Sequence, residues 1–239
     1  MSSQMHSVIV GGSSGIGLAS AALLLAQGHR VTITGRNADR LRKAQATLHD
    51  KAGCLEMDAA DAQAVRAQFK KLGTFDHLVL AFGSHMGAGP IKDVALDDVR
   101  QGFTEKVFPH FDCAQAATAH VARNGSITFI AAVSAHAALP GTAGLGAANG
   151  AITAMVPILA RELQPVRVNA VSPGVIDTPW WDFMPHEQKA SIFADFATKT
   201  PVGRNGSPED IAQVIAFLIG NKFMTGQTIV CDGGLQLAA

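Results

Sequence analysis

Short apolar runs alternate with longer helix-forming stretches along the whole chain. The apolar runs are rich in β-branched and aromatic residues, and the stretches between them are amphipathic or alanine-rich. Seven such runs lie at residues 8–10, 31–35, 53–57, 77–82, 126–131, 166–171 and 228–232. This alternation predicts an α/β fold, a doubly wound parallel sheet of about seven strands with right-handed crossovers and helices on both faces. No repeat, linker or composition break divides residues 1–239, so we expect a single domain.

The first apolar run leads directly into a glycine-rich turn, SVIVGGSSGIG at residues 7–17. Gly11 allows a tight turn, Gly15 allows backbone amides to approach a pyrophosphate, and Gly17 allows the next helix to pack closely. The positive end of that helix then faces the phosphates. The strand before and the helix after favour a Rossmann-like nucleotide site over a plain structural turn. The residues expected to bind the cofactor here are Gly11, Ser13, Ser14, Gly15, Ile16 and Gly17.

Composition excludes several other classes of protein. The 239 residues are 48% hydrophobic and 16% charged with zero formal net charge, which gives no electrostatic support for binding nucleic acid or a membrane surface. The apolar stretches are expected to be too short to cross a bilayer, and we expect no signal peptide before the glycine turn. Cys54, Cys113 and Cys231 are widely spaced in apolar segments, so we expect reduced core thiols in a cytoplasmic protein.

Later motifs, together with the glycine turn, resemble the short-chain dehydrogenase/reductase family from end to end. They are Asp58, RVNAVSPGVIDTP at 167–179, PVGRNGSPEDIAQVIAFL at 201–218 and TGQTIVCDGG at 225–234. The resemblance implies that Asp58 bonds the adenine amino group. It also implies a homo-oligomer, a tetramer or a dimer, acting on a small-molecule substrate. The further cofactor-binding residues that it implies are Ala59, Ala81, Phe82, Gly83, Asn149, Pro173, Gly174, Ile176 and Thr178.

The end of the second predicted strand bears on the choice of cofactor. An NAD-preferring enzyme places a carboxylate there for the adenosine ribose, whereas this chain has Gly35 followed by Arg36 and Asn37. A guanidinium can hold a 2′-phosphate through two hydrogen bonds. The sequence therefore favours NADP(H) over NAD(H), unless Arg36 is simply a solvated residue at the start of the next helix.

The chain has no tyrosine, so the proton donor of the family is absent. By the resemblance, Leu145 stands at the tyrosine, Asn149 at the lysine, Ala132 at the serine and Lys106 at the asparagine. Lysine and asparagine have in effect exchanged places, which makes Lys106 and Asn149 the candidate catalytic residues. The alternative for Lys106 is an exposed helix lysine. Pro109 should bend the helix that carries Lys106, and Pro157 should similarly disturb the later helix that carries Leu145 and Asn149.

Other groups could replace the missing proton donor. His85, His136 and His186 follow the fourth, fifth and sixth strands, where a substrate would enter. Their spacing matches no metal motif, and loop histidines are usually solvated. Ser134 either points into the cleft or serves a turn. The residues expected to make the cleft apolar are Phe82, Trp180, Trp181, Phe183 and Met184.

Two interpretations remain open from the sequence. The first is an atypical NADPH-dependent oxidoreductase acting on a small, largely apolar substrate. The second is a nucleotide-binding pseudoenzyme with a sensing or partner-binding role. The retained cofactor motifs and a cap-like segment at 180–200 favour the enzyme.

Overall fold

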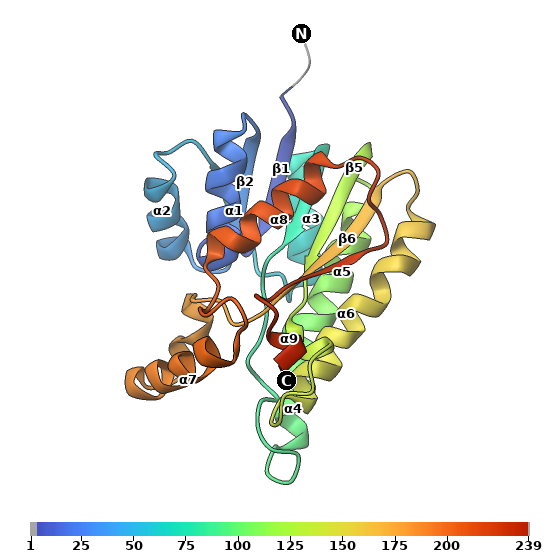
Figure 1. Ribbon diagram of the computed structural model, residues 1–239. Coiled ribbons are helices and arrows are strands. Elements are labelled where there is room, and N and C mark those ends of the chain that lie inside the picture. The colour runs from blue at the N-terminus through green and yellow to red at the C-terminus, as the bar shows by residue number, and fades with distance from the viewer. Residues whose placement is uncertain (1–3, 239) are drawn as a thin grey trace.

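A seven-stranded parallel sheet forms the centre of the molecule in the computed structural model, which describes residues 4–238 (Figure 1). The strand order is β3-β2-β1-β4-β5-β6-β7, and every neighbouring pair is parallel. The strands are β1 (His6–Val10), β2 (Arg30–Gly35), β3 (Gly53–Glu56), β4 (Phe75–Leu80), β5 (Val121–Ile130), β6 (Arg167–Pro173) and β7 (Thr228–Cys231). All seven strands predicted from the apolar runs are confirmed, as is the doubly wound α/β class.

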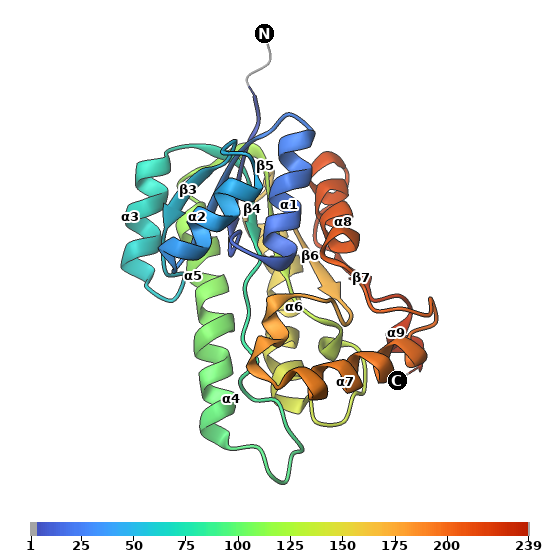
Figure 2. The same cartoon turned by 90° about the vertical axis from the view of Figure 1, so that its left-hand side faces the viewer.

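Helices cover both faces of the sheet (Figures 1 and 2). The first face carries α1 (Gly15–Ala26), α2 (Ala38–Thr47) and α8 (Pro208–Gly220). The second carries α3 (Ala62–Leu72), α5 (Phe108–Ala117) and α6 (Ala143–Glu162). The shorter or outlying elements are α4 (Leu96–Gly102), η1 (Phe103–Val107), η2 (Val133–Ala135), η3 (Pro179–Phe183), α7 (His186–Lys199) and α9 (Leu235–Ala238).

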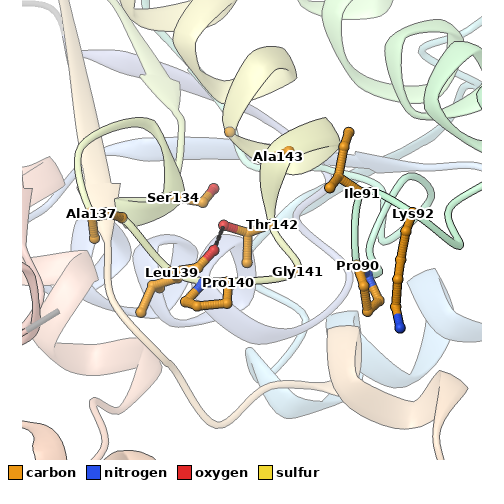
Figure 3. Close-up of a pocket in the computed structure, with 12 residues that line it drawn as sticks. Pro90, Ile91, Lys92, Ser134, Ala137, Leu139, Pro140, Gly141, Thr142 and Ala143 are labelled. Carbon is orange, nitrogen blue, oxygen red and sulfur yellow. Dashed lines mark hydrogen bonds between the residues drawn. The ribbon is translucent and has the colours of Figure 1, made fainter.

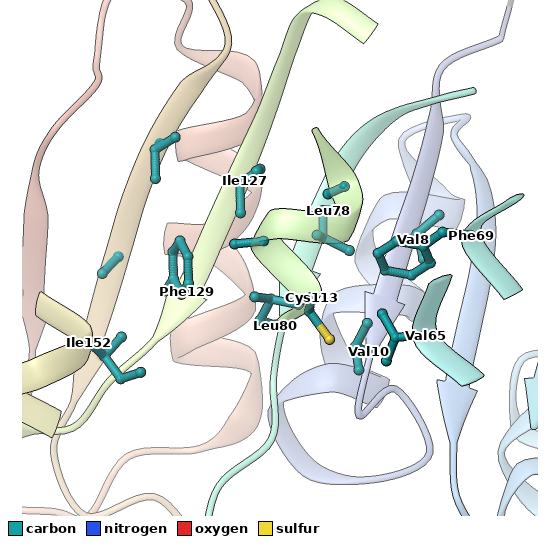
Figure 4. Packing of buried hydrophobic residues seen from close by; sticks show 14 of the residues in the cluster. Val8, Val10, Val65, Phe69, Leu78, Leu80, Cys113, Ile127, Phe129 and Ile152 are labelled. Atoms are coloured by element: carbon teal, nitrogen blue, oxygen red, sulfur yellow. The ribbon is translucent and has the colours of Figure 1, made fainter. Parts of the chain in front are cut away.

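Two apolar layers separate the sheet from its helices. Because successive strand residues point to opposite faces, Val8 and Val10 face the α3, α5 and α6 layer, while Ile9 faces the other layer. Figure 4 shows Phe69 of α3 packed beside strand side chains in the layer that α3, α5 and α6 cover. Phe69 and Phe75 meet edge to face with ring centroids 5.5 Å apart.

The strand order reverses between β1 and β4, because the crossover from β1 runs to β2 on one side and later strands add on the other. The glycine turn follows β1 and the loop 81–95 follows β4, so both meet at the carboxyl edge at this switch point. In open α/β sheets this is the place where ligands bind. Figure 2 shows α4 and α7 beyond the same edge.

The cysteines are free thiols, but only one belongs to the core. Cys113 is buried on α5, whereas Cys231 is half-buried and Cys54 is exposed. The expectation of three core thiols is therefore wrong for Cys54. The reason is that β3 is the edge strand and pairs only with β2, so three of its four residues are exposed.

Proline affects two helices differently. Pro109 follows a π-helical turn, η1, that separates α4 from α5, and this irregularity confirms the predicted disturbance. Pro157 lies inside α6, yet α6 continues unbroken from Ala143 to Glu162. We expected a disturbance there as well, but the packing of α6 on β6 and η2 preserves the helix.

The same helix corrects the expectation that every apolar stretch is too short to span a bilayer. By length and composition alone, α6 could cross a membrane, with a mean hydropathy of 1.5 over its most apolar window. Ile152 and Val156 of α6 nevertheless pack into the apolar layer against β5 and β6. In this structure α6 is one of the helices that cover the sheet.

A layer of buried histidines lies at the amino edge of the sheet, opposite the glycine turn. His6 begins β1, His77 lies in β4, and His29 immediately precedes β2. His77 Nδ1 and Ser126 Oγ share a hydrogen bond of 2.9 Å, and His29 Nδ1 and Ser7 Oγ share another of 2.9 Å. The rings of His29 and His77 are 5.8 Å apart.

Candidate functional site

The glycine turn brings three backbone segments into contact at the carboxyl edge. Gly11 has a positive φ of 81° and donates its N–H to Thr34 O at 3.1 Å. A Cβ at Gly11 would lie 2.4 Å from Ala81 O, and a Cβ at Gly17 would lie 2.3 Å from Gly11 O. Only glycine therefore lets α1 and the loop after β4 approach the turn this closely.

The start of α1 lies at the predicted phosphate site. Ser14 is the N-cap residue, but its side chain makes no capping hydrogen bond, so the first-turn amides have no side-chain cap. Gly15 has φ +50°, and a Cβ there would lie 3.1 Å from the Thr178 side chain. Ser13 Oγ approaches Gly35, and Ile16 packs against the apolar layer under α1.

The residues predicted for the adenosine half also lie at this edge. Arg36 is exposed at the end of β2, and Asn37 caps α2 by accepting a hydrogen bond from Arg40 N at 2.9 Å. Asp58 is exposed after β3, where its Oδ1 accepts from Ala60 N at 3.0 Å. Both Arg36 and Asp58 are thus accessible to a ligand from solvent.

Lys106 lies in the π-helical turn and its amine reaches the ends of two central strands. Its Nζ donates to Ala131 O at 3.4 Å, and a Cβ at Gly83 would lie 3.5 Å from this nitrogen. The side chain is 7% exposed and has no ion-pair partner within residues 4–238. Burial lowers the pKa of Lys106 to about 8. The interpretation of Lys106 as an exposed helix lysine is therefore wrong.

Asn149 lies on the first half of α6 and is 4% exposed. Its Nδ2 donates to Leu145 O at 2.9 Å and to Ser134 Oγ at 3.2 Å. Its Oδ1 is buried and has no hydrogen-bond partner within the described residues. A buried acceptor without a partner is expensive, so this oxygen is suited to a hydroxyl group of a ligand.

Comparison with known proteins identifies the family of this chain. A family model described as enoyl-(acyl carrier protein) reductase matches residues 10–236. The chain belongs to the short-chain dehydrogenase/reductase family. Carbonyl reductase family member 4 of Danio rerio is 30% identical over 241 residues, covering 96% of this chain and 97% of that protein.

Two further relatives agree over almost the whole chain. The 3-oxoacyl-[acyl-carrier-protein] reductase of Thermotoga maritima is 30% identical, covering 96% of this chain and 97% of its own. A solved small-chain dehydrogenase in complex with NADPH superposes with a TM-score of 0.86 at 29% identity, covering 98% of this chain and 99% of that one.

The structure places the remaining family positions around Lys106 and Asn149. Ala132 directly follows Ala131, and Leu145 lies one helical turn before Asn149 on α6. Both side chains are half-buried and neither can transfer a proton. The residues predicted for the nicotinamide side begin at the end of β6, where Gly174 contacts the Asp232 backbone so closely that a Cβ would lie 2.8 Å from the Asp232 Cα.

The other residues predicted at that end are also near the carboxyl edge. Pro173 is the last residue of β6, Ile176 bridges to Gly206, and Thr178 is the N-cap of η3. Ala81 donates to Val10 O at 2.8 Å, which holds the loop after β4 against the glycine turn. Ala59 packs against the apolar layer of the second face.

An aromatic contact joins the loop after β4 to the cap formed by η3 and α7. His85 stacks on Phe183 with ring centroids 4.1 Å apart, and Trp180 meets both rings edge-on. Trp181 meets Trp180 edge-on with ring centroids 4.8 Å apart, donates to Ile176 O at 3.0 Å and packs on Phe193. The predicted apolar cleft is thus divided: Trp180 and Phe183 face His85, whereas Trp181 anchors the cap.

The remaining predicted cleft residues have other positions. His136 and His186 are exposed at the end of η2 and the start of α7. Phe82 packs against the buried ring of His110 in a tilted arrangement with ring centroids 4.1 Å apart, and Met184 is half-buried after η3. Within residues 4–238, no group of three histidine, cysteine or acidic side chains is placed to hold a metal ion.

An apolar cavity of about 570 Å³ opens beside Ser134, between the loop after β4 and the start of α6 (Figure 3). Its wall is formed by Pro90, Ile91, Lys92, Ser134, Ala137, Ala138, Leu139, Pro140, Gly141, Thr142, Ala143 and Gly146. Ser134 also contacts Asn149, so one side chain borders both the cavity and the candidate site.

Sequence reasoning missed Glu105 and His110. Glu105 accepts hydrogen bonds from Ser84 Oγ at 2.5 Å and Gln101 Nε2 at 2.8 Å, tying η1 to the loop after β4. Burial would raise the pKa of Glu105, but these bonds, with Arg36 and His85, lower it. Burial, with the Lys106 charge, lowers the pKa of His110 to about 3. Pro109 was the available signal that this turn is irregular.

The close approach of Gly17 to Gly11 yields a stability prediction. Gly17→Ala should destabilise the protein by about 2 kcal/mol or more, because the new Cβ would overlap Gly11 O. The matched control is Gly150→Ala in α6, where nothing lies within 4 Å of the new Cβ. That variant should be about 0.5 to 1 kcal/mol more stable than the native chain. Chemical denaturation measures both, and equal effects would contradict the packing described.

Proposed function

We propose that this chain is an NADPH-dependent reductase of a small, largely apolar substrate, working through a site in which Lys106 and Asn149 replace the usual catalytic set of the family. The observation that carries the proposal is the buried Lys106 amine at the ends of β4 and β5, with no carboxylate partner within residues 4–238. Burying such a charge is unfavourable unless the site uses it.

The residues at the carboxyl edge fit a dinucleotide. The glycine turn lets α1 and the loop after β4 lie close together at this edge, and the start of α1 has no side-chain cap. A solved relative is a complex with NADPH, and the exposed Arg36 offers a guanidinium to a 2′-phosphate. When bound, NADPH would supply the hydride for the reduction.

Lys106 and Asn149 would act at the nicotinamide ribose. The Lys106 ammonium has three hydrogens and makes only one long hydrogen bond within residues 4–238. Asn149 Oδ1 is an acceptor without a partner in the same range. Together they offer a donor and an acceptor to a sugar diol, and the ammonium supplies positive charge near the reacting atoms.

The walls of the site favour a largely apolar substrate. The cavity beside Ser134 is lined mostly by alanine, proline, leucine and isoleucine, and Trp180 and Phe183 lie at the cap. Relatives are described as carbonyl reductase and 3-oxoacyl-[acyl-carrier-protein] reductase. Both names fit reduction of a polar double bond in an apolar molecule.

Stopped-flow measurement of NADPH oxidation across ketones, imines, quinones and activated alkenes tests the proposal. Turnover of any member above the rate without protein supports a reductase. NADPH binding with no turnover across the panel would favour a nucleotide-binding pseudoenzyme instead, and Leu145 at the tyrosine position is the feature that favours this alternative.

Arg36 is expected to select NADPH over NADH. Arg36→Ala should weaken NADPH binding by about 1.5 to 3 kcal/mol, the range for a charged hydrogen bond, and leave NADH binding unchanged. Arg40→Ala is the control, because Arg40 is also exposed but lies one turn further along α2. Isothermal titration calorimetry measures both cofactors. Equal affinity of the native protein for NADPH and NADH would refute this selection.

Lys106 is expected to make cofactor affinity depend on pH. Its amine is charged below a pKa of about 8, so NADPH affinity should fall as the pH rises through 8 to 9.5. Lys106→Met keeps much of the packing and should bind at least tenfold more weakly at pH 7, about 1.4 kcal/mol, with a flat profile above pH 7. Fluorescence titration measures both proteins. Identical profiles would show that Lys106 does not contact the ligand.

We also expect a homotetramer, or failing that a dimer, in solution. Phe108 and Phe111 on α5 and Ile158 on α6 are 58%, 48% and 58% exposed, a large apolar surface on neighbouring helices. Light scattering at micromolar concentration should give a multiple of the chain mass, and Phe111→Glu should lower it. Ile91→Glu, at an exposed position outside those helices, is the control. A monomeric native protein would contradict the expectation.

A further inference from the structure

The end of the Lys106 side chain lies directly beneath an exposed glycine of the loop after β4. A Cβ at Gly83 would lie 3.5 Å from Lys106 Nζ, and its three nearest atoms outside residues 82–84 would all belong to the Lys106 side chain. Gly83 is exposed and has no side chain that covers the amine. The space beside Gly83 therefore opens from the carboxyl edge onto Lys106 Nζ.

No negative charge offsets this amine within residues 4–238. Lys106 Nζ forms no salt bridge there, and its one hydrogen bond, to Ala131 O, is long at 3.4 Å. The carboxylate of the preceding residue, Glu105, accepts a hydrogen bond from Ser84 Oγ instead. His110 Nδ1 donates to Lys106 O at 2.7 Å, and burial with the Lys106 charge lowers the pKa of His110 to about 3, so its ring is neutral.

Lys106 is the only buried lysine in the described part of the chain. Burial disfavours the charged ammonium and lowers the pKa of Lys106 to about 8. At pH 7 an amine of this pKa is neutral in about one molecule in ten, whereas a lysine of ordinary pKa is neutral in fewer than about one in a thousand. The neutral amine has a free electron pair, so Lys106 is suited to attack an electrophilic carbon that enters beside Gly83.

An aldehyde is the electrophile that fits this position. The Lys106 nitrogen would add to the carbonyl carbon, and loss of the carbonyl oxygen as water would leave a carbon–nitrogen double bond. One amine and one aldehyde thus give one imine and one water, with no oxidant or reductant, and water reverses the reaction. The approach past Gly83 favours a small aldehyde, because the rest of the Lys106 side chain is buried.

We propose that Lys106 is a covalent binding site for small aldehydes, which form an imine with its amine and thereby compete with the dinucleotide. The competition rests on the proposed function, in which the Lys106 amine binds the nicotinamide ribose. The formation of the imine does not rest on it. An aldehyde is then a reversible inhibitor of cofactor binding.

Propanal with sodium cyanoborohydride tests imine formation in the cofactor-free protein, because the reagent reduces the imine to a stable secondary amine. Peptide mass spectrometry gives the initial rate of propylation at each lysine. At pH 7, Lys106 should react at least tenfold faster than Lys92, an exposed lysine of the same loop as Gly83. This ratio should fall toward pH 10, where lysines of ordinary pKa also lose their protons. A ratio of one or less at pH 7 would overturn the inference.

Two variants test the chemistry and the route to the amine. Lys106→Arg keeps a positive charge but forms no imine with propanal, so modification at position 106 should disappear while that of Lys92 stays unchanged. Gly83→Val should slow modification of Lys106 at least fivefold, because the new side chain covers the amine. Ala88→Val, at another exposed position of the loop, is the control and should not slow it. Thermal unfolding shows that each variant is folded, and unchanged modification in Gly83→Val would contradict the geometry on which the inference depends.

The competition is tested by repeating the propanal reaction with the native protein saturated with NADP⁺, as established by calorimetry. Modification of Lys106 should slow at least fivefold, while that of Lys92 should not change. Undiminished modification of Lys106 in the saturated protein would overturn the competition and the proposed position of the cofactor beside Lys106. It would leave imine formation standing, because that is decided by the cofactor-free protein alone.

Discussion

The contact between Gly17 and Gly11 is the constraint on which the rest of the carboxyl edge depends. It lets the first turn of α1 lie directly on the turn after β1, and Gly11 in turn lies against Ala81 after β4. Residues 11–17 and Ala81, which lie far apart in the sequence, meet there in close backbone contact. The amides at the start of α1 and the ends of β4 and β5 are therefore held in fixed positions relative to one another. Lys106 and Asn149 lie beside these segments.

The site beside these segments contains buried polar groups whose charge or hydrogen-bonding capacity is not met by the residues that the structure describes. Lys106 brings a buried positive charge and Asn149 brings a buried acceptor, and neither is satisfied by the residues that the structure describes. In a well-packed interior such groups weaken the fold, and in the function proposed above a bound cofactor completes them. The neighbouring His110 stays neutral, since burial and the Lys106 charge lower its pKa to about 3, and it adds no second charge.

Short-range patterns predicted the sheet and the glycine turn well, because strand alternation and positive φ are local properties. Lys106 was left open because its burial depends on the π-helical turn of η1, for which Pro109 gave only an indirect signal. Cys54 was misplaced because the edge position of β3 follows from strand order, which no local pattern contains. The partnership of Asn149 with Ser134 joins residues in different elements, so sequence could suggest Ser134 but not the direction of its hydrogen bond.

The histidine layer at the amino edge limits the pH range in which the folded state is stable, independently of catalysis. Burial is the main reason that the pKa values of His6 and His77 are lowered to about 4, and burial also lowers that of His29. In the unfolded chain the same rings take up protons near pH 6.5. The folded state is therefore fully favoured above that pH and loses stability as the pH falls from about 6.5 toward 4. Much of the stability that this protein loses in acid is thus set by three uncharged rings at the edge of the sheet farthest from its chemistry, together with His110 beside Lys106.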